Sequence, residues 1–156
     1  MDTITLLPER CTGCLSCEMA CSLSHEGSSC SCLSRIRIKK WGEIALYFPI
    51  VCQHCENAPC ITTCPTKARK RKTENGAVVT DEKWCVGCKS CIYACPYGAP
   101  VIHPVTGKTM TCDLCDGKPL CVDVCSVGAL SYPRNGKFSI EQMMVSLRTR
   151  PLVGAP

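Results

Sequence analysis

The sequence has few of the features that mark enzymes, nucleic-acid-binding proteins or membrane proteins. Aromatic residues make up only 5% of its 156 residues, so an ordinary hydrophobic core would be thin. No apolar run approaches the roughly 18 residues that cross a bilayer, so we expect no direct membrane insertion. No nucleophile–base pair and no paired carboxylates stand in a motif. Nothing here indicates that the protein itself catalyses a reaction.

The N-terminal sequence also lacks a targeting signal. Residues 1–10 (MDTITLLPER) contain neither a basic n-region nor a long apolar core, and no twin-arginine leader is present. We therefore expect no secretion, and a thiol-rich chain without a leader is expected in the reducing cytoplasm.

Cysteine is the one residue type in large excess, with eighteen copies. The run Cys85–Pro96 has the spacing C-x2-C-x2-C-x3-C-P, which is typical of bacterial ferredoxins. In such a run the first three thiolates bind iron atoms of one cluster, and the fourth binds a different cluster. One run therefore predicts another that supplies the missing ligand.

Three further runs of this kind occur, with the middle gap lengthened in two of them. A unit that repeats in this way predicts a repeated supersecondary structure. The sixteen cysteines of the four runs are Cys11, Cys14, Cys17 and Cys21; Cys52, Cys55, Cys60 and Cys64; Cys85, Cys88, Cys91 and Cys95; and Cys112, Cys115, Cys121 and Cys125.

Four [4Fe–4S] clusters are the interpretation that the spacing favours. Zinc sites also use C-x2-C pairs, but zinc gives no reason for a third cysteine so close behind or for a Cys-Pro step. A disulfide framework would require secretion. Each cluster with four thiolates carries about −2, so four clusters would outweigh the formal charge of +5 on the polypeptide. We therefore interpret the basic residues as partly neutralising the clusters.

The four runs, CTGCLSCEMAC, CQHCENAPCITTCP, CVGCKSCIYACP and CDLCDGKPLCVDVC, resemble the four-cluster iron–sulfur subunits of molybdenum and tungsten oxidoreductases. That family includes the beta subunits of dimethyl sulfoxide reductase and formate dehydrogenase and the small electron-transfer subunits of aldehyde oxidoreductases. The resemblance covers roughly residues 3–132. It implies four ligand groups: Cys11, Cys14, Cys17 and Cys125; Cys112, Cys115, Cys121 and Cys21; Cys52, Cys55, Cys60 and Cys95; and Cys85, Cys88, Cys91 and Cys64.

The fold implied by the resemblance is α+β: a polyferredoxin of duplicated bacterial-type 2[4Fe–4S] ferredoxin modules, with the inner module nested in the outer one. Ser22 and Ser126 depart from the pattern, because they stand where the first and fourth runs would have proline. We expect a four-cluster domain over residues 1–132 and a C-terminal tail over residues 133–156.

Short strands and hairpins are expected between the runs. Asn75-Gly76 between two extended segments is a strong hairpin signal. One or two helical turns are expected over residues 18–23, and residues 3–7 and 128–132 should pair. The predicted hairpins join residues 35–39 to 43–48, 67–72 to 77–80, and 99–103 to 108–111.

The tail has the pattern of a short amphipathic helix. Ser139 begins a capping-box spacing, and Ile140, Met143, Met144 and Leu147 follow at helical intervals. Such a helix could cover its own domain or dock on another subunit, because methionine-rich faces adapt to different partners.

Cys30 and Cys32 lie outside the runs, in a small polar loop. An extra metal site with His25 is one interpretation, and two free thiols in a loop is the one we favour. His54 and His103 are not needed as ligands, so they tune cluster potentials through hydrogen bonds or have no special role.

The cationic residues 67–72 form either a solvated hairpin that offsets cluster charge or a docking patch for an acidic redox partner. No aromatic residues interleave with them, so nucleic-acid binding is not expected. Residues 104–109 (PVTGKT) lack the first glycine of a phosphate-binding loop.

The resemblance implies an electron-transfer subunit that relays electrons through four [4Fe–4S] clusters. Its partners would be a catalytic subunit, which we expect to be a tungsten or molybdenum aldehyde oxidoreductase, and a second redox protein such as a flavoprotein or ferredoxin. A hydrogenase, formate dehydrogenase or carbon monoxide dehydrogenase partner, or a free-standing ferredoxin, remains an alternative. Head-to-tail self-association is a further option, since heterologous contacts need not close.

Overall fold

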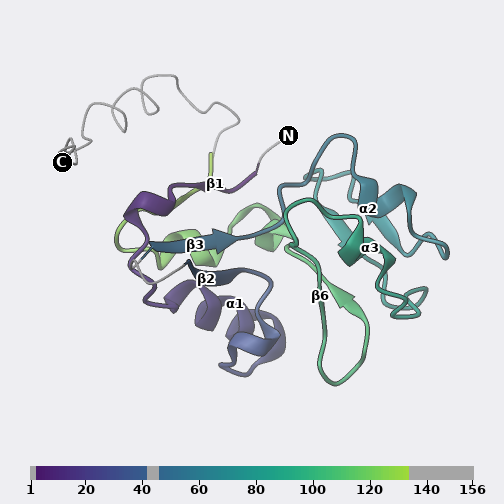
Figure 1. Cartoon of the computed structure of the whole chain (residues 1–156), viewed down its shortest axis with the longest axis horizontal. Helices are drawn as coiled ribbons and strands as arrows, with labels where there is room; N and C mark the ends of the chain where they lie inside the picture. Colours follow the sequence, from purple (N-terminus) through teal and green to yellow (C-terminus); the bar gives the residue numbers. More distant parts are fainter. Residues whose placement is uncertain (1–2, 42–45, 134–156) are drawn as a thin grey trace.

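The computed structural model describes residues 3–41 and 46–133 and arranges them in two lobes (Figure 1). The lobe with α2 and α3 contains the second and third cysteine runs, and we call residues 52–111 the inner module. The other lobe, with α1 and β1–β3, is built from the described residues on either side, and we call it the outer module. The inner module is thus an insertion between the two halves of the outer one, and the predicted nested α+β arrangement is confirmed.

Four two-stranded antiparallel sheets hold the described residues together. In the outer module β1 pairs with β8, and β2 pairs with β3; in the inner module β4 pairs with β5, and β6 with β7. The strand bounds are β1 Thr5–Leu6, β2 Arg37–Trp41, β3 Leu46–Ile50, β4 Arg69–Arg71, β5 Val78–Thr80, β6 Val101–Ile102, β7 Thr109–Met110 and β8 Leu130–Ser131.

A helix lies within each cysteine run, and the helices pack in the pairs that the nesting requires. In the outer module α1 packs against α4, and in the inner module α2 packs against α3. The α-helices are α1 Ser16–Glu26, α2 Pro59–Thr62, α3 Ser90–Tyr93 and α4 Leu120–Asp123, and the 3-10 helices are η1 Pro8–Arg10, η2 Ser31–Leu33 and η3 Leu114–Gly117.

The helix of the first run is longer than the sequence predicted. It covers eleven residues, where one or two turns were expected. Residues 16–26 contain neither proline nor glycine, and Ser22 replaces the proline that follows the second and third runs. The helix ends at Gly27, which adopts a left-handed conformation and donates from its N–H to the Leu23 carbonyl.

The predicted hairpins form. In the β4–β5 turn the N–H of Ala77 donates to Oδ1 of Asn75, and the N–H of Lys72 to the Ala77 carbonyl. The strand β3 extends beyond the expected end at residue 48, because Pro49 pairs with Ile38 in a two-stranded sheet whose outer edges need no donor. The turn at 42–45 and the predicted tail helix lie outside the described residues.

Strands β1 and β8 join the two ends of the described sequence. Thr5 pairs with Ser131 and Leu6 with Leu130, as the sequence predicted. This pairing closes the outer module around the inner one.

Cysteines contribute much of the buried core. The largest fully buried apolar side chains include Ile4, Ile36, Val51, Val78 and Leu114, and no aromatic side chain is among the buried hydrophobic residues of the described segments. Seven cysteines of the four runs join this core: Cys17, Cys21, Cys52, Cys60, Cys91, Cys112 and Cys121. In the described residues no helix has the length and apolar character that crossing a membrane requires.

Candidate iron–sulfur sites

The first predicted group lies near the N-terminal end of α1. Cys11, Cys14, Cys17 and Cys125 all line one cavity, which encloses about 340 Å³ including space open to solvent. Three of these residues come from the first run, and the fourth comes from the last run more than a hundred residues later. The packing of α1 on α4 brings the two runs together.

The second predicted group comes from the same two runs, but here the fourth run supplies three cysteines and the first run supplies one, Cys21. Burial raises the pKa of the Cys121 thiol, and the neighbouring Cys21 and Cys115 raise it further. Burial and the neighbouring Cys121 also raise the pKa of the Cys112 thiol. The thiol of Cys21 thus lies with those of the fourth run.

The inner module repeats this exchange. Cys52, Cys55, Cys60 and Cys95 line a second cavity of about 320 Å³, again including space open to solvent. Burial raises the pKa of Cys52 to about 11, and Cys60 and Cys95 contribute to the rise.

The fourth group, like the first, includes one exposed thiol. Cys88 is exposed, and its thiol is close enough to Cys64 to interact with it electrostatically. The sulfurs of Cys85 and Cys91 both contact Thr109, at 3.4 Å from its N–H and 3.5 Å from its hydroxyl respectively. The structure thus brings the fourth cysteine of each run near one or more cysteines of its partner run.

A left-handed residue at the same place in every run shapes these loops. The second residue after the first cysteine is Gly13, His54, Gly87 or Leu114, with φ of 72°, 46°, 68° and 63°. This conformation costs a non-glycine residue about 1–2 kcal/mol. His54 and Leu114 are completely or almost completely buried, and Nδ1 of His54 accepts a 2.9 Å bond from the Val78 N–H. Packing therefore offsets the strain where glycine is absent.

Backbone amides are directed at the cysteine sulfurs. Hydrogen bonds to ligand sulfurs are a known determinant of iron–sulfur cluster potentials. The N–H groups of Arg35, Thr109 and Leu114 donate to the sulfurs of Cys21, Cys85 and Cys112, each at 3.4 Å.

Hydrogen bonding and burial shift the pKa of individual thiols in opposite directions. In Cys14 and Cys88, hydrogen bonds from Ser16 and Ser90 lower the pKa, because they stabilise the thiolate. In Cys17, burial raises the pKa to about 12. A thiolate is the form that binds metal, so the buried thiols need a bound cation to ionise, which fits a metal cluster rather than free thiols.

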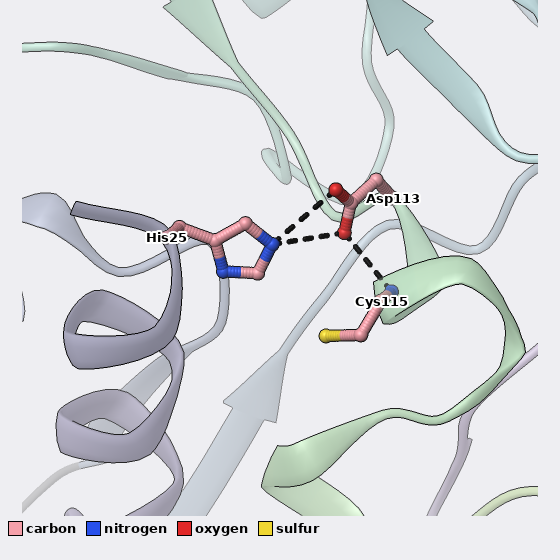
Figure 2. Close-up of side chains that lie close together, drawn as sticks. All are labelled: His25, Asp113 and Cys115. Carbon is pink, nitrogen blue, oxygen red and sulfur yellow. Dashed lines mark hydrogen bonds and ion pairs between the residues drawn. The ribbon is translucent and has the colours of Figure 1, made fainter. Parts of the chain in front are cut away.

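Asp113 and His25 form a contact between the two halves of the outer module (Figure 2). Nε2 of His25 lies 3.1 and 3.3 Å from the two carboxylate oxygens, and one of these also accepts a 3.0 Å bond from the Cys115 N–H. Nδ1 of His25 lies 2.9 Å from the Cys21 carbonyl. The hydrogen bond to Asp113 is the main reason why the pKa of His25 is raised, so this imidazole is protonated at neutral pH.

The same carboxylate is linked to a wider ion-pair network. Arg35 donates to Asp113 and to Glu26, both at 3.4 Å, and His103 lies 3.4 Å from Glu26. The network joins α1 to the loop of the fourth run and to the β6–β7 hairpin. Sequence reasoning missed it, because its charged residues lie far apart in the sequence and follow no motif.

The three histidines have structural contacts. His25 faces Asp113 and not the Cys30 loop, and Nδ1 of His103 accepts from the N–H groups of Val105 and Thr106. Burial lowers the pKa of His54 to about 4, so its ring is neutral and can accept the Val78 bond.

The expectation of two free thiols at residues 30 and 32 is wrong. Cys30 and Cys32 form a disulfide, with their Cα atoms 5.3 Å apart. The 3-10 turn η2 begins at Ser31 and curls the backbone, which brings the two side chains together.

The cationic run is less solvated than either sequence interpretation assumed. Arg69 is only 2% exposed and lines the cavity of the Cys52 group. Lys70 pairs with Asp81, and Lys72 with Asp116. The sequence did contain a signal for the burial of Arg69. Side chains alternate along a strand, so residues 69 and 71 of β4 face the side opposite to the exposed Lys70.

Comparison with known families covers most of the sequence. The profile of the 4Fe-4S dicluster domain family matches residues 44–135, and that of the 4Fe-4S binding domain family matches residues 8–24. The two matches together include all four runs.

Several characterised relatives are similar over most of the sequence. The protein is 40% identical over 122 residues to the aliphatic sulfonate oxidoreductase polyferredoxin-like subunit of Pyrococcus furiosus, covering 78% of this sequence and 70% of that one. It is 36% identical over 148 residues to the thiosulfate reductase electron transfer subunit PhsB of Salmonella typhi, covering 86% and 76%. It is 38% identical over 141 residues to a subunit of the anaerobic dimethyl sulfoxide reductase of Escherichia coli (strain K12), covering 79% and 68%.

A solved structure shares the fold. A polypeptide of the active site complex BamBC of benzoyl coenzyme A reductase with benzoyl-CoA superimposes with a TM-score of 0.52 and 29% sequence identity, covering 96% of this protein and 90% of that one.

Proposed function

Since this protein is a member of the 4Fe-4S dicluster domain family, we propose that its sixteen run cysteines hold four [4Fe–4S] clusters and that it is the electron-transfer subunit of an oxidoreductase complex. When bound, each cluster supplies a reversible one-electron step. The ligand groups are Cys11, Cys14, Cys17 and Cys125; Cys112, Cys115, Cys121 and Cys21; Cys52, Cys55, Cys60 and Cys95; and Cys85, Cys88, Cys91 and Cys64.

The observation that carries this proposal is the serial arrangement of the four groups. Cys17 of the first group is near enough to Cys121 of the second to influence its pKa. Cys112 of the second group is influenced in the same way by Cys52 of the third. The third and fourth groups exchange Cys95 and Cys64 between the packed helices α2 and α3. The order is therefore first, second, third, fourth.

The exposed thiols lie at the two ends of this series. Cys14 in the first group and Cys88 in the fourth are exposed, and no cysteine of the second or third group is. A series of sites with accessible ends suits a relay between two partners. One end would face a catalytic subunit and the other a second redox protein, such as a flavoprotein or a ferredoxin.

Our proposal for the catalytic partner rests on the family resemblance. A tungsten or molybdenum enzyme of the aldehyde oxidoreductase type is the partner we propose, with the reaction taking place in that subunit. The similarity to electron-transfer subunits of other oxidoreductases supports a non-catalytic role for this protein.

The first test is metal analysis of the complex purified anaerobically from its native host. About sixteen iron atoms and as much labile sulfide per copy of this protein, beyond those of the partner, would support the proposal. Tungsten or molybdenum in the same complex would support the proposed partner, and nickel would contradict it. Zinc without labile sulfide would overturn the cluster assignment.

The relay is tested by Cys88→Ser, with Cys30→Ser as the control because Cys30 belongs to no group. We expect the Cys88 variant to lose one cluster and to transfer electrons slowly while still assembling with its partner. The control should retain all four clusters. Wild-type electron throughput in the Cys88 variant would refute the serial relay.

A further inference from the structure

Arg69 is a charged side chain in the interior of the inner module. It lies on β4 with only 2% of its surface exposed, and it lines the cavity of the Cys52, Cys55, Cys60 and Cys95 group. Its Nη2 donates to the sulfur of Cys60 at 3.5 Å. A positive charge is therefore held directly against one ligand of the third site.

Two threonine hydroxyls fix the position of this guanidinium. Nη1 donates to Oγ1 of Thr80 on β5 and to Oγ1 of Thr111 after β7, both at 2.8 Å. The Thr111 hydroxyl in turn donates to the Val78 carbonyl at 3.2 Å. The side chain is thus held by neutral groups from two segments, so its orientation is determined by the fold.

No carboxylate in the described segments forms an ion pair with Arg69. The described ion pairs involve other cations, among them Lys70 with Asp81 and Arg35 with Asp113. A buried charge without a counter-ion is strongly unfavourable. Here the cysteine sulfurs are the available negative groups, and the guanidinium contacts one of them directly, the sulfur of Cys60. The positive charge is therefore matched to the charge of the site it faces.

We propose that Arg69 raises the reduction potential of the cluster held by Cys52, Cys55, Cys60 and Cys95. This inference rests on the proposed function, because it requires a cluster at that site. Reduction adds one negative charge, and a fixed cation in a poorly solvated interior stabilises the more negative state. Removing the cation must then make reduction less favourable.

The second site provides a contrast within the same protein. There the cations His25 and Arg35 face the carboxylates of Asp113 and Glu26, so the positive and negative charges nearly balance. At the third site the cation is not balanced by a described carboxylate. Arg69 therefore gives the third site a positive bias that the second does not have.

The test is a redox titration of the anaerobically purified full-length protein, followed by electron paramagnetic resonance. Arg69→Gln removes the charge, and Arg69→Lys keeps it. Lys70→Gln is the matched control, because it removes a positive charge from the same strand at a side chain that is 58% exposed. We expect one of four reduction steps in Arg69→Gln to become at least tenfold less favourable, a shift of about 59 mV to more negative potential for a one-electron couple. Arg69→Lys should shift less, and the control should not shift.

The outcomes separate this inference from the proposed function. Four clusters with unchanged potentials in Arg69→Gln would overturn the role of Arg69 and leave the function intact. Loss of one cluster in both Arg69 variants would make the residue structural and would also overturn the inference. Loss in Arg69→Gln alone, with wild-type potentials in Arg69→Lys, would support an electrostatic role. A wild-type protein without clusters would instead refute the proposed function.

Discussion

Replacing Gly87 by alanine tests how closely the third run is wrapped against the rest of the inner module. Gly87 lies between Cys85 and Cys88 with φ of 68°, and a Cβ there would clash with the carbonyl oxygen of Gly107 in the β6–β7 loop. The left-handed conformation alone costs an alanine about 1–2 kcal/mol. A methyl group forced into a filled space costs a further ~1–3 kcal/mol. We expect Gly87→Ala to lower the free energy of unfolding by roughly 2–5 kcal/mol.

Gly98→Ala is the matched control for backbone strain. Gly98 also has a positive φ, of 60°, but its Cβ would meet no heavy atom within 4 Å. This variant should therefore lose only about 1–2 kcal/mol. The assay is unfolding of the holo-protein in denaturant under anaerobic conditions, followed by circular dichroism and by the visible absorbance of the clusters. Equal midpoints for the two variants would show that the contact with Gly107 does not constrain the loop.

Two other predictions follow from the outer module and the core. Asp113→Asn should cost roughly 1–3 kcal/mol, because it leaves His25 without its Asp113 carboxylate and Arg35 with Glu26 alone, and these two cationic side chains are only 13% and 16% exposed. Asp116→Asn, at an 81% exposed side chain, should change stability by less than about 0.5 kcal/mol, and a similar loss in both variants in denaturant titrations would contradict the network's role. Removal of iron with a chelator should abolish the far-ultraviolet circular dichroism signal, because seven buried cysteines would lose the clusters that hold them together. A native-like spectrum after complete iron loss would show that the fold does not depend on the metal.

Local sequence signals were sufficient for the hairpins. Asn75-Gly76 favours a tight turn whatever surrounds it, and the flanking strands are short enough for the turn to determine their register. The cysteine spacing is similarly local, since three ligands within seven residues must face one another in a compact loop. The nested pairing of the runs then determined which helices pack together.

Features that depend on contacts distant in sequence could not be predicted in this way. His25 and Asp113 are 88 positions apart, and neither lies in a motif that specifies the other. Arg69 resembles its basic neighbours in composition, and only the alternation of its strand separates it from them. The full length of α1 was also missed, since only one or two turns were expected where the helix covers Ser16–Glu26.

The pairing of β1 with β8 has a consequence for biosynthesis. The inner module is complete once residue 111 has left the ribosome, because its hairpins and helices pair within residues 52–111. The outer module must wait for Cys125 and for the strand Leu130–Ser131, although its first cysteine run is synthesised before the whole inner module. Nascent polypeptides therefore carry Cys11, Cys14 and Cys17 without Cys125 while the residues between them are synthesised. The interval in which oxidation or a wrong metal can damage this protein is thus set by its topology, and it falls on the outer module.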